Sequence, residues 1–362
     1  MGTWLQSIPY YTYYSLFYYF VVAVVVLYVV YLQAQKRELS SGHMWWCLAL
    51  VVVVGILMGY APMADYGDKF NYAAGFRTLA MGWEADVGRD AGWHYYTWVC
   101  GRFLTVTQYF ILTAIIYSMG FFVIANHVSP AYRTSVFLMY LSFFLFVGYA
   151  TNTIRGGFAS ALLLMAVSQF EKRKIWFIIL AFAAVQCHKS MWLPVGAFVL
   201  AYFWTSNRWA LVFWAISIPV SAVAGHYFEL LFAPFVEEIA QDSSSYLTAE
   251  GESNNYKVGF RLDFILFSLA PVVWGWYQIE KRRLKDFLYG QLYRTYLIAN
   301  FFWILVIRAP FSDRFAYLSW MFGPLLLLYP IVRGSTSGTY KNRAVSYMLL
   351  GSLAFYVYMH VR

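Results

Sequence analysis

Long apolar segments alternate with short polar segments along almost the whole chain. A helix needs about 20 mainly apolar residues to cross the hydrocarbon core, where its backbone polar groups must pair within the helix. The pattern predicts an all-α, polytopic integral membrane protein with about 12 transmembrane helices, forming one transmembrane domain over residues 1–362. The predicted spans lie at about residues 16–32, 45–60, 104–125, 135–149, 156–170, 175–185, 191–204, 210–228, 262–279, 293–307, 315–332 and 345–358.

The charged residues agree with this number of spans. If the amino terminus lies outside, the inner loops contain 15 of the 26 Lys and Arg residues but only four of the 17 Asp and Glu residues. The dense EKRK and EKRR clusters at 171–174 and 280–283 then both lie inside, as the positive-inside rule requires. Two longer outer loops remain, at about residues 61–103 and 229–261.

The composition excludes a soluble globular protein and argues against a nucleic-acid-binding protein. Hydrophobic residues make up 61% of the chain and charged residues 12%, about half the charged share of soluble proteins. The net charge of +9 is explained by the basic inner loops, so we expect no nucleic-acid partner. The first apolar segment lacks a basic region and a small-residue cleavage site, which indicates a retained helix. A disulfide between Cys100 and Cys187 is a minor alternative.

The segment 151–157, TNTIRGG, places an arginine and two glycines at the outer end of a predicted span. Thr151, Asn152 or Thr153 can cap the following helix, which puts Arg155 in or near its first turn. A cation there opposes the helix dipole, but a helix amino terminus with a guanidinium suits a phosphate or diphosphate. Gly156 and Gly157 would permit close approach. The alternative is an arginine reaching the interface and glycines that serve helix packing.

Further polar residues lie at other predicted outer boundaries. His188 is a candidate base or phosphate ligand, because imidazole changes protonation near neutral pH, and the alternative is a structural histidine. Arg308 and Arg314 flank Asp313, which indicates either a second cationic clamp or a structural Arg314–Asp313 pair. Arg261 and Asp263 form a similar but weaker pattern. Ionisable groups at helix ends usually face a protein or water-filled interior.

The first outer loop combines acidic and aromatic residues, which suit sugar rings because flat apolar faces stack and carboxylates bind hydroxyls. These residues are Asp65, Asp68, Glu84, Asp86 and Asp90, with Trp83, Trp93, Tyr95, Tyr96 and Trp98. The alternative is a helix lying in the membrane interface. Glu84 and Asp86 could hold a divalent cation, but so short a pattern is weak. The chain has no zinc, P-loop, GxGxxG or GxSxG pattern, so we expect no metal and no cofactor.

Several short motifs together resemble the EpsG-like family, the Wzy-type polymerases of bacterial exopolysaccharide, capsule and O-antigen. They are Asn152, Ile154, Arg155 and Ala159, the basic turn at 171–174, His188 with Ser190, DYGDKFNY at 65–72 and DRFAYL at 313–318. Gly156 departs from the pattern, where glutamine is expected.

The resemblance implies an enzyme of the bacterial cytoplasmic membrane, with a GT-C-like fold and a site on the outer, periplasmic face. It would join undecaprenyl-diphosphate-linked repeat units, which requires a cationic clamp, a base and an outward cleft. Its partners would be that glycan, membrane lipid and a chain-length regulator protein. The implied diphosphate ligands are Arg155 and Arg314, with Arg308 and Arg89 in reserve; the candidate bases are Asp68, Glu84 and His188. The implied substrate-binding residues are Asp65, Asn152, Trp83, Trp93, Tyr95, Arg261 and Asp263.

Two other classes remain open. An O-antigen-ligase-like enzyme or an acyltransferase of glycan assembly would need similar groups. A transporter would place polar groups at the bilayer midplane or in broken helices. The centres of the predicted spans are nearly free of charge, which favours an enzyme acting on a membrane-resident substrate.

Overall fold

The structure, a computed structural model, describes residues 8–40, 44–63, 68–82, 90–239, 259–309, 312–334 and 337–361. These residues form helices, turns and irregular segments, without a strand among them. The all-α prediction is therefore confirmed for the described part of the chain. The chain divides into two compact units: unit 1 comprises Met1–Lys189 and Ile331–Arg362, and unit 2 comprises Ser190–Pro330.

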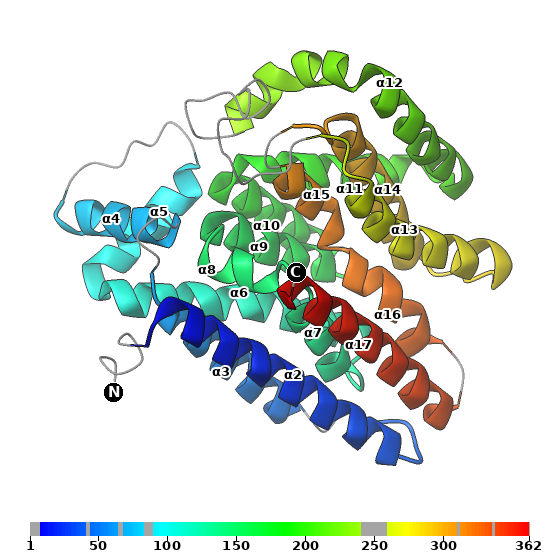
Figure 1. Cartoon of the computed structure of the whole chain (residues 1–362), viewed down its shortest axis with the longest axis horizontal. Helices are drawn as coiled ribbons and strands as arrows, with labels where there is room; N and C mark the ends of the chain where they lie inside the picture. Colours follow the sequence, from blue (N-terminus) through cyan, green and yellow to red (C-terminus); the bar gives the residue numbers. More distant parts are fainter. Residues whose placement is uncertain are drawn as a thin grey trace. The chain divides into compact units, whose positions relative to one another are not determined.

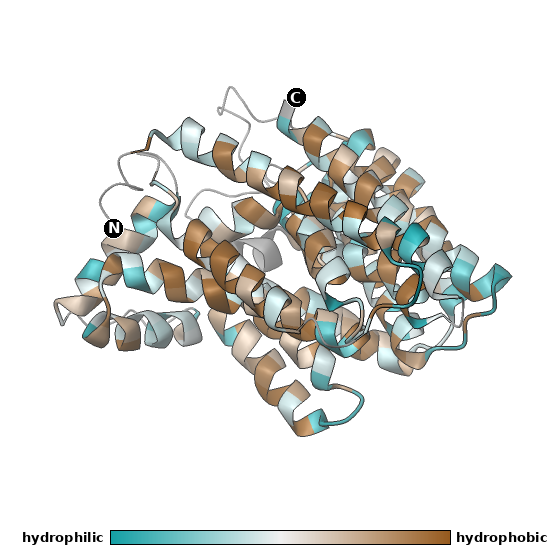
Figure 2. Cartoon of the chain, turned by 90° about the horizontal axis from the view of Figure 1, so that it is seen from below, coloured by the Kyte–Doolittle hydropathy of each residue, from teal (hydrophilic) through white to brown (hydrophobic). Residues whose placement is uncertain are grey.

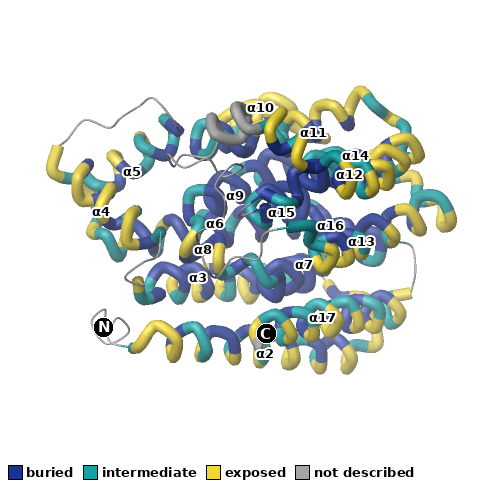
Figure 3. The backbone as a smooth tube through the Cα atoms, turned by 45° about the horizontal axis from the view of Figure 1, so that its top comes forward, coloured by how far each residue is buried: buried dark blue, intermediate teal, exposed yellow. Residues whose placement is uncertain are grey.

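Unit 1 is built around α6 and α9. Its helices are α2 (Tyr10–Ala34), α3 (Met44–Tyr60), α4 (Asp68–Ala80), α5 (Ala91–Phe103), α6 (Val106–Val128), α7 (Arg133–Leu141), α8 (Phe146–Thr151), α9 (Ile154–Gln169), α10 (Lys174–Cys187) and α17 (Gly338–Val361) (Figure 1). Helix α9 is buried along most of its length, whereas α2 and α17 keep exposed faces (Figure 3). A Cβ added at Gly120 of α6 would lie 2.6 Å from the Cα of Ala161, so glycine lets α6 and α9 pack closely.

Unit 2 is built around α14, which is buried on nearly all sides. Its helices are α11 (Trp192–Phe203), α12 (Asn207–Ile239), α13 (Leu262–Trp276), α14 (Phe287–Leu305), α15 (Ser312–Trp320) and most of α16 (Gly323–Arg333). Asn300 joins three elements, because its side chain accepts a hydrogen bond from Trp214 at 2.7 Å and donates to Ser319 at 2.8 Å and Ser268 at 3.3 Å. Such a satisfied polar network fixes the helices in one register.

The apolar helices agree with a multi-pass membrane protein. Among the described residues, five segments are long and apolar enough to cross a membrane: Tyr10–Ala34, Val106–Val128, Asn207–Phe232, Leu262–Lys281 and Ser312–Arg333. Shorter apolar helices are Met44–Tyr60, Ile154–Gln169, Lys174–Cys187 and Lys189–Phe203. Hydrophobic residues dominate the helices, and hydrophilic ones gather at helix ends and turns (Figure 2). The number of about 12 spans and the GT-C-like fold stay predictions.

Three predicted segments differ from the structure. The predicted span at 135–149 is divided into α7 and α8 by a turn, and the predicted outer loop at 61–103 contains the helices α4 and α5. Both helices bury one stripe, in α4 through Lys69, Ala73, Phe76 and Leu79, but each is too short to show as a membrane span. Helix α12 extends to Ile239, inside the second predicted loop, and is kinked at Ala224.

Some contacts inside each unit join residues that the predicted topology assigns to the same side of the membrane. In unit 1, Lys341 Nζ lies 2.7 Å from Glu38 Oε1 at one end of the α2–α17 pair, and Tyr18 stacks on His360 at the other. Further described ion pairs, His127–Glu171 and Arg208–Glu280, each join residues that the sequence places on the inner side.

Candidate functional site

Asp90, directly before α5, joins the beginning of α9 by an ion pair and the segment after α10 by a hydrogen bond. Arg155 Nη1 lies 3.1 Å from Asp90 Oδ2. The other carboxylate oxygen of Asp90 accepts a hydrogen bond from the main-chain N–H of Lys189, at 2.8 Å. We call this set, Asp90, Asn152, Arg155, His188 and Lys189, the Arg155 junction. It lies wholly in unit 1.

Asp90 is fixed by its backbone as well as by its contacts. It precedes α5 with φ 49° and ψ 44°, a left-handed conformation that aspartate tolerates better than most residues. Its side chain does not cap α5 and instead contacts Arg155 and Lys189. Only 4% of the side chain is exposed. Burial raises the pKa of Asp90 above its ordinary value, and the charge of Arg155 opposes this rise.

Arg155 is the second residue of α9, so its predicted place in the first turn is confirmed. Its side chain is 15% exposed, and its Nε atom is buried without a hydrogen-bond partner among the described residues. A cation at this position opposes the helix dipole, and the Asp90 carboxylate offsets that cost. Because a guanidinium carries five N–H donors, Arg155 can bind Asp90 and still donate to a second anion.

The predicted capping of α9 is wrong. Thr153 stands at the capping position, but its side chain makes no capping hydrogen bond. Thr151 donates to the carbonyl of Val147 at 2.9 Å. Asn152 Oδ1 accepts from the main-chain N–H of Asp68 at 3.0 Å, at the beginning of α4. The Asn152 side chain therefore joins α4 to the segment before α9, an effect that spacing alone does not show.

The two glycines have different neighbours. A Cβ at Gly157 would collide with the carbonyl oxygen of Tyr149, so this glycine serves close packing of α8 on α9, the alternative named for it. A Cβ at Gly156 would lie 3.6 Å from His188 Cδ2. His188 therefore lies beside the first turn of α9. The structure thus brings Asp68, Asn152, Arg155 and His188, predicted from separate segments, into one part of unit 1.

Lys69 holds α4 against the end of α3 and was given no role from the sequence. Its ammonium is buried and donates to the carbonyls of Gly59 at 3.0 Å and Ala61 at 2.6 Å. It also lies 4.8 Å from the ring centroid of Phe110. Burial lowers the pKa of Lys69 to about 7. The ammonium satisfies carbonyls that the end of a helix leaves unpaired, so it positions Asp68 next to Asn152.

The predicted sugar-binding aromatic residues separate into buried and exposed ones. Trp93 is 4% exposed and packs against Tyr72, Tyr96, Tyr109 and Phe158, at centroid distances of 5.6 to 6.1 Å. Its ring is a core element and has no open face for a sugar. Tyr95 is 59% exposed on the opposite side of α5, and Trp98 is 40% exposed. Tyr95 and Trp98 are therefore the exposed aromatic side chains of this set, and the Arg102 guanidinium lies 5.0 Å from the ring centroid of Trp98.

The predicted arginines Arg261, Arg308 and Arg314 lie in unit 2. Arg308 Nη2 donates to the carbonyl of Ala222 at 2.7 Å, where the kink of α12 disturbs the helix bonding. Arg261 makes two hydrogen bonds to Asp263, at 2.9 and 2.7 Å, which makes this a structural ion pair. Arg314 lies half-buried in the first turn of α15, next to Asp313.

Several predicted residues lie outside the described residues: Asp65, Trp83, Glu84, Asp86 and Arg89. In the described ranges, no group of three or more His, Cys, Asp or Glu side chains is placed to hold a metal ion. Cys100 and Cys187 are free and buried, so the disulfide considered between them is not formed. Sequence reasoning named Asp90 only among the acids suited to sugar and missed its pairing with Arg155, whose signal was an acid directly before an aromatic helix on the same predicted side.

Comparison with known proteins was made on the whole chain. The model of the EpsG family matches residues 44–362, which include every helix described here except α2. No curated protein and no solved structure matches the chain significantly. The matched range contains the complete Arg155 junction. The chain therefore belongs to the EpsG family, the family of Wzy-like polysaccharide polymerases.

Proposed function

We propose that this protein joins undecaprenyl-diphosphate-linked repeat units into a polysaccharide at the outer face of the bacterial cytoplasmic membrane. Membership of the EpsG family supports a polymerase role in general. The observation that carries the finer proposal is Arg155, a guanidinium held by a buried carboxylate at a helix amino terminus. That combination suits a diphosphate, because helix N–H groups and a guanidinium both stabilise phosphate oxygens.

The proposed reaction is a displacement at the anomeric carbon of the growing chain. The hydroxyl oxygen of the incoming lipid-linked unit bonds to that carbon, and the bond from the carbon to the diphosphate oxygen breaks. The lipid diphosphate leaves with the electron pair, and the hydroxyl proton passes to a base. Arg155 would stabilise the charge that develops on the leaving diphosphate, where preorganised donors act most strongly. No nucleotide is consumed.

The base is proposed among residues near Arg155. His188 lies beside the first turn of α9, and Asp68 begins α4 next to Asn152. Either could accept the hydroxyl proton, and Glu84 remains a third candidate. Asn152, Tyr95, Asp65 and Trp83 are proposed to contact sugar, and a chain-length regulator is the proposed protein partner.

Arg314 remains the proposed second ligand of the diphosphate, with Arg89 in reserve. Arg308 is a weaker candidate because a main-chain carbonyl of α12 already occupies one of its N–H groups. Arg261 is weaker for a similar reason, since both of its contacting nitrogen atoms bind Asp263.

The lipid-linked glycans of a deletion strain test the proposed function. Loss of a polymerase leaves single repeat units on the lipid, and the wild-type gene restores long chains. Long chains that stay on the lipid would instead identify a ligase. Glycans of unchanged length and attachment would contradict an enzyme of glycan assembly and favour a transporter. For variants of Arg155, the matched control is Arg77→Ala, because Arg77 is an exposed arginine near the far end of α4.

A further inference from the structure

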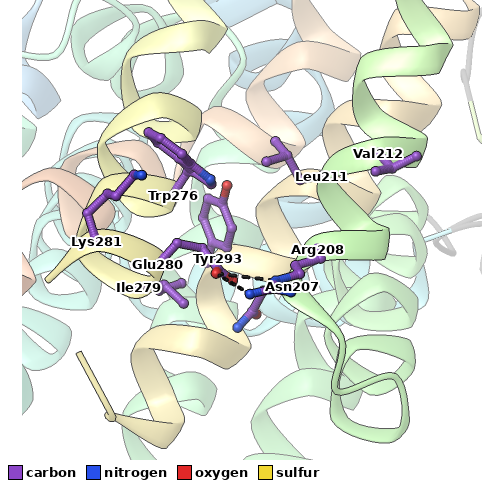
Figure 4. Close-up of a pocket in the computed structure, with 9 residues that line it drawn as sticks. All are labelled: Asn207, Arg208, Leu211, Val212, Trp276, Ile279, Glu280, Lys281 and Tyr293. Atoms are coloured by element: carbon purple, nitrogen blue, oxygen red, sulfur yellow. Dashed lines mark hydrogen bonds and ion pairs between the residues drawn. The ribbon is translucent and has the colours of Figure 1, made fainter. Parts of the chain in front are cut away.

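Unit 2 contains a pocket of about 450 Å³ where the beginning of α12 faces the end of α13. Asn207, Arg208 and Val212 line it from α12, and Tyr293 lines it from α14. Trp276 and Lys281 belong to the end of α13 and to the π-helical turn Tyr277–Lys281 that follows it. Figure 4 shows these side chains around the pocket. The sequence predicts the pocket residues on the cytoplasmic side, whereas it predicts the residues of the Arg155 junction on the outer side.

The rim of the pocket carries two cations, Arg208 and Lys281, and one carboxylate, Glu280. Arg208 is 82% exposed and donates from Nε and Nη2 to one oxygen of Glu280, at 3.3 and 3.1 Å. Figure 4 shows Arg208 and Glu280 pointing toward each other. Since both bonds use one carboxylate oxygen, the guanidinium keeps N–H donors for another acceptor. Lys281 adds a second cation, 5.4 Å from the ring centroid of Trp276. The exposed cations Arg282, Arg283 and Lys285 follow it in the chain.

A buried cation stands directly behind one wall. Arg294 is 5% exposed and donates to Asn207 Oδ1 at 2.8 Å and to the carbonyl of Ala201 at 3.1 Å. Both acceptors are neutral, and the described residues supply no carboxylate to Arg294. The buried charge contributes a positive potential at the wall of the pocket, because Asn207, which accepts its hydrogen bond, is one of the lining residues.

The helices beside the pocket are apolar on their exposed sides. Phe213 and Ile216 of α12 are 45% and 49% exposed, and Val273 of α13 is 55% exposed. Both helices are among the segments apolar enough to cross a membrane. A ligand that fits this arrangement has an anionic head for the rim and an apolar tail that lies along the helices. The inner leaflet of a membrane supplies such molecules, and basic residues near its surface attract them.

We propose that this pocket binds the phosphate of an anionic phospholipid, with its acyl chains along α12 and α13. Arg208 and Lys281 would contact the phosphate, and the buried charge of Arg294 would strengthen its attraction. Trp276 would lie at the boundary between headgroup and acyl chains, a position that tryptophan favours.

The test uses the full-length protein in nanodiscs of phosphatidylcholine with a minor fraction of phosphatidylglycerol. Native mass spectrometry measures the phosphatidylglycerol retained. We expect an Arg208→Ala/Lys281→Ala variant to retain it at least about tenfold more weakly, since the loss of even one charge-assisted contact corresponds to about a tenfold change and the variant loses two. Val212→Trp, which fills the pocket without changing charge, should have the same direction of effect. The matched control is Arg37→Ala/Arg343→Ala. It removes two exposed cations of unit 1 that the sequence also predicts on the cytoplasmic side of the membrane.

Three results would overturn the proposal. The first is equal retention by the wild type, both pocket variants and the control. The second is an equal loss of retained phosphatidylglycerol in the control and in the double pocket variant, which would indicate a general effect of charge. The third is protection against thermal unfolding by inorganic phosphate equal to that by phosphatidylglycerol, which would indicate a soluble-anion site. Polymer synthesis in each variant shows separately whether the proposed function holds.

Discussion

Arg155 and Asp90, which are 65 positions apart in the sequence, are joined by an ion pair at 3.1 Å between the first turn of α9 and the residue that precedes α5. Asp90 is held from its other side by the main-chain N–H of Lys189, so its position does not depend on Arg155 alone. The guanidinium is therefore fixed at the beginning of α9, where it would otherwise be unfavourable. An arginine held in place by a carboxylate loses little freedom when an anion binds, which favours tight binding of a diphosphate.

Replacing Arg155 alone should affect stability as well as activity. Arg155→Ala leaves the Asp90 carboxylate buried without its counter-charge, which typically costs about 3 kcal/mol or more. The pKa of Asp90, already raised by burial, should rise further because the opposing effect of Arg155 is lost. With a raised folded pKa, the folded state binds more protons than the unfolded state, so stability decreases as pH rises through that window. In detergent, the unfolding temperature of Arg155→Ala should thus fall further below that of the wild type at about pH 8 than at about pH 5.

The double variant Asp90→Asn/Arg155→Gln is the control for this prediction. It removes both charges and keeps hydrogen-bonding groups, and asparagine tolerates the left-handed backbone of residue 90. We expect it to unfold close to the wild type at both pH values. A decrease in the unfolding temperature of Arg155→Ala that is the same at both pH values would contradict the electrostatic coupling of Asp90 and Arg155.

Lys69 should make stability depend on pH in the opposite sense. Its pKa is lowered to about 7 from 10.5, so the unfolded state binds more protons between these values and stability rises with pH across that range. Lys69→Met should remove this rise and leave the carbonyls of Gly59 and Ala61 without their donor, at about 1–3 kcal/mol each. Unfolding temperatures measured across the range check both effects. Equal slopes in the wild type and Lys69→Met would show that Lys69 does not titrate there.

Trp93 and Tyr95 separate core packing from substrate contact. Trp93→Ala should destabilise the protein by about 3–5 kcal/mol, because a buried aromatic side chain is lost from a cluster of rings. Tyr95→Ala should change stability by less than about 0.5 kcal/mol while reducing polymer synthesis, because the side chain is exposed. Unfolding temperature and polymer yield are measured on the same preparations. Normal stability in Trp93→Ala would refute its place in the core.

The sequence predicted the features that depend on local pattern. Apolar runs located the apolar helices, and the polar segment before residue 156 located Arg155 in the first turn of α9. Features that depend on tertiary contacts were not accessible. In the sequence, Asp90 is one acid among several, and only the fold shows that it contacts Arg155. Trp93 likewise has the pattern of a surface aromatic residue, and only the fold shows that it is buried. Helices α4 and α5 were not among the predicted spans because their amphipathic stripes are shorter than a membrane span, and a helix in this loop was considered only as an alternative.

The central claim, that Arg155 serves the leaving diphosphate, is tested most directly with purified protein and purified lipid-diphosphate-linked repeat units. The wild type and Arg77→Ala should form polymer and release undecaprenyl diphosphate in proportion to the bonds made. The Asp90→Asn/Arg155→Gln variant, folded as judged by its unfolding temperature, should bind the lipid-linked unit more weakly and form little polymer. Polymer and released diphosphate at wild-type rates from that variant would contradict the claim.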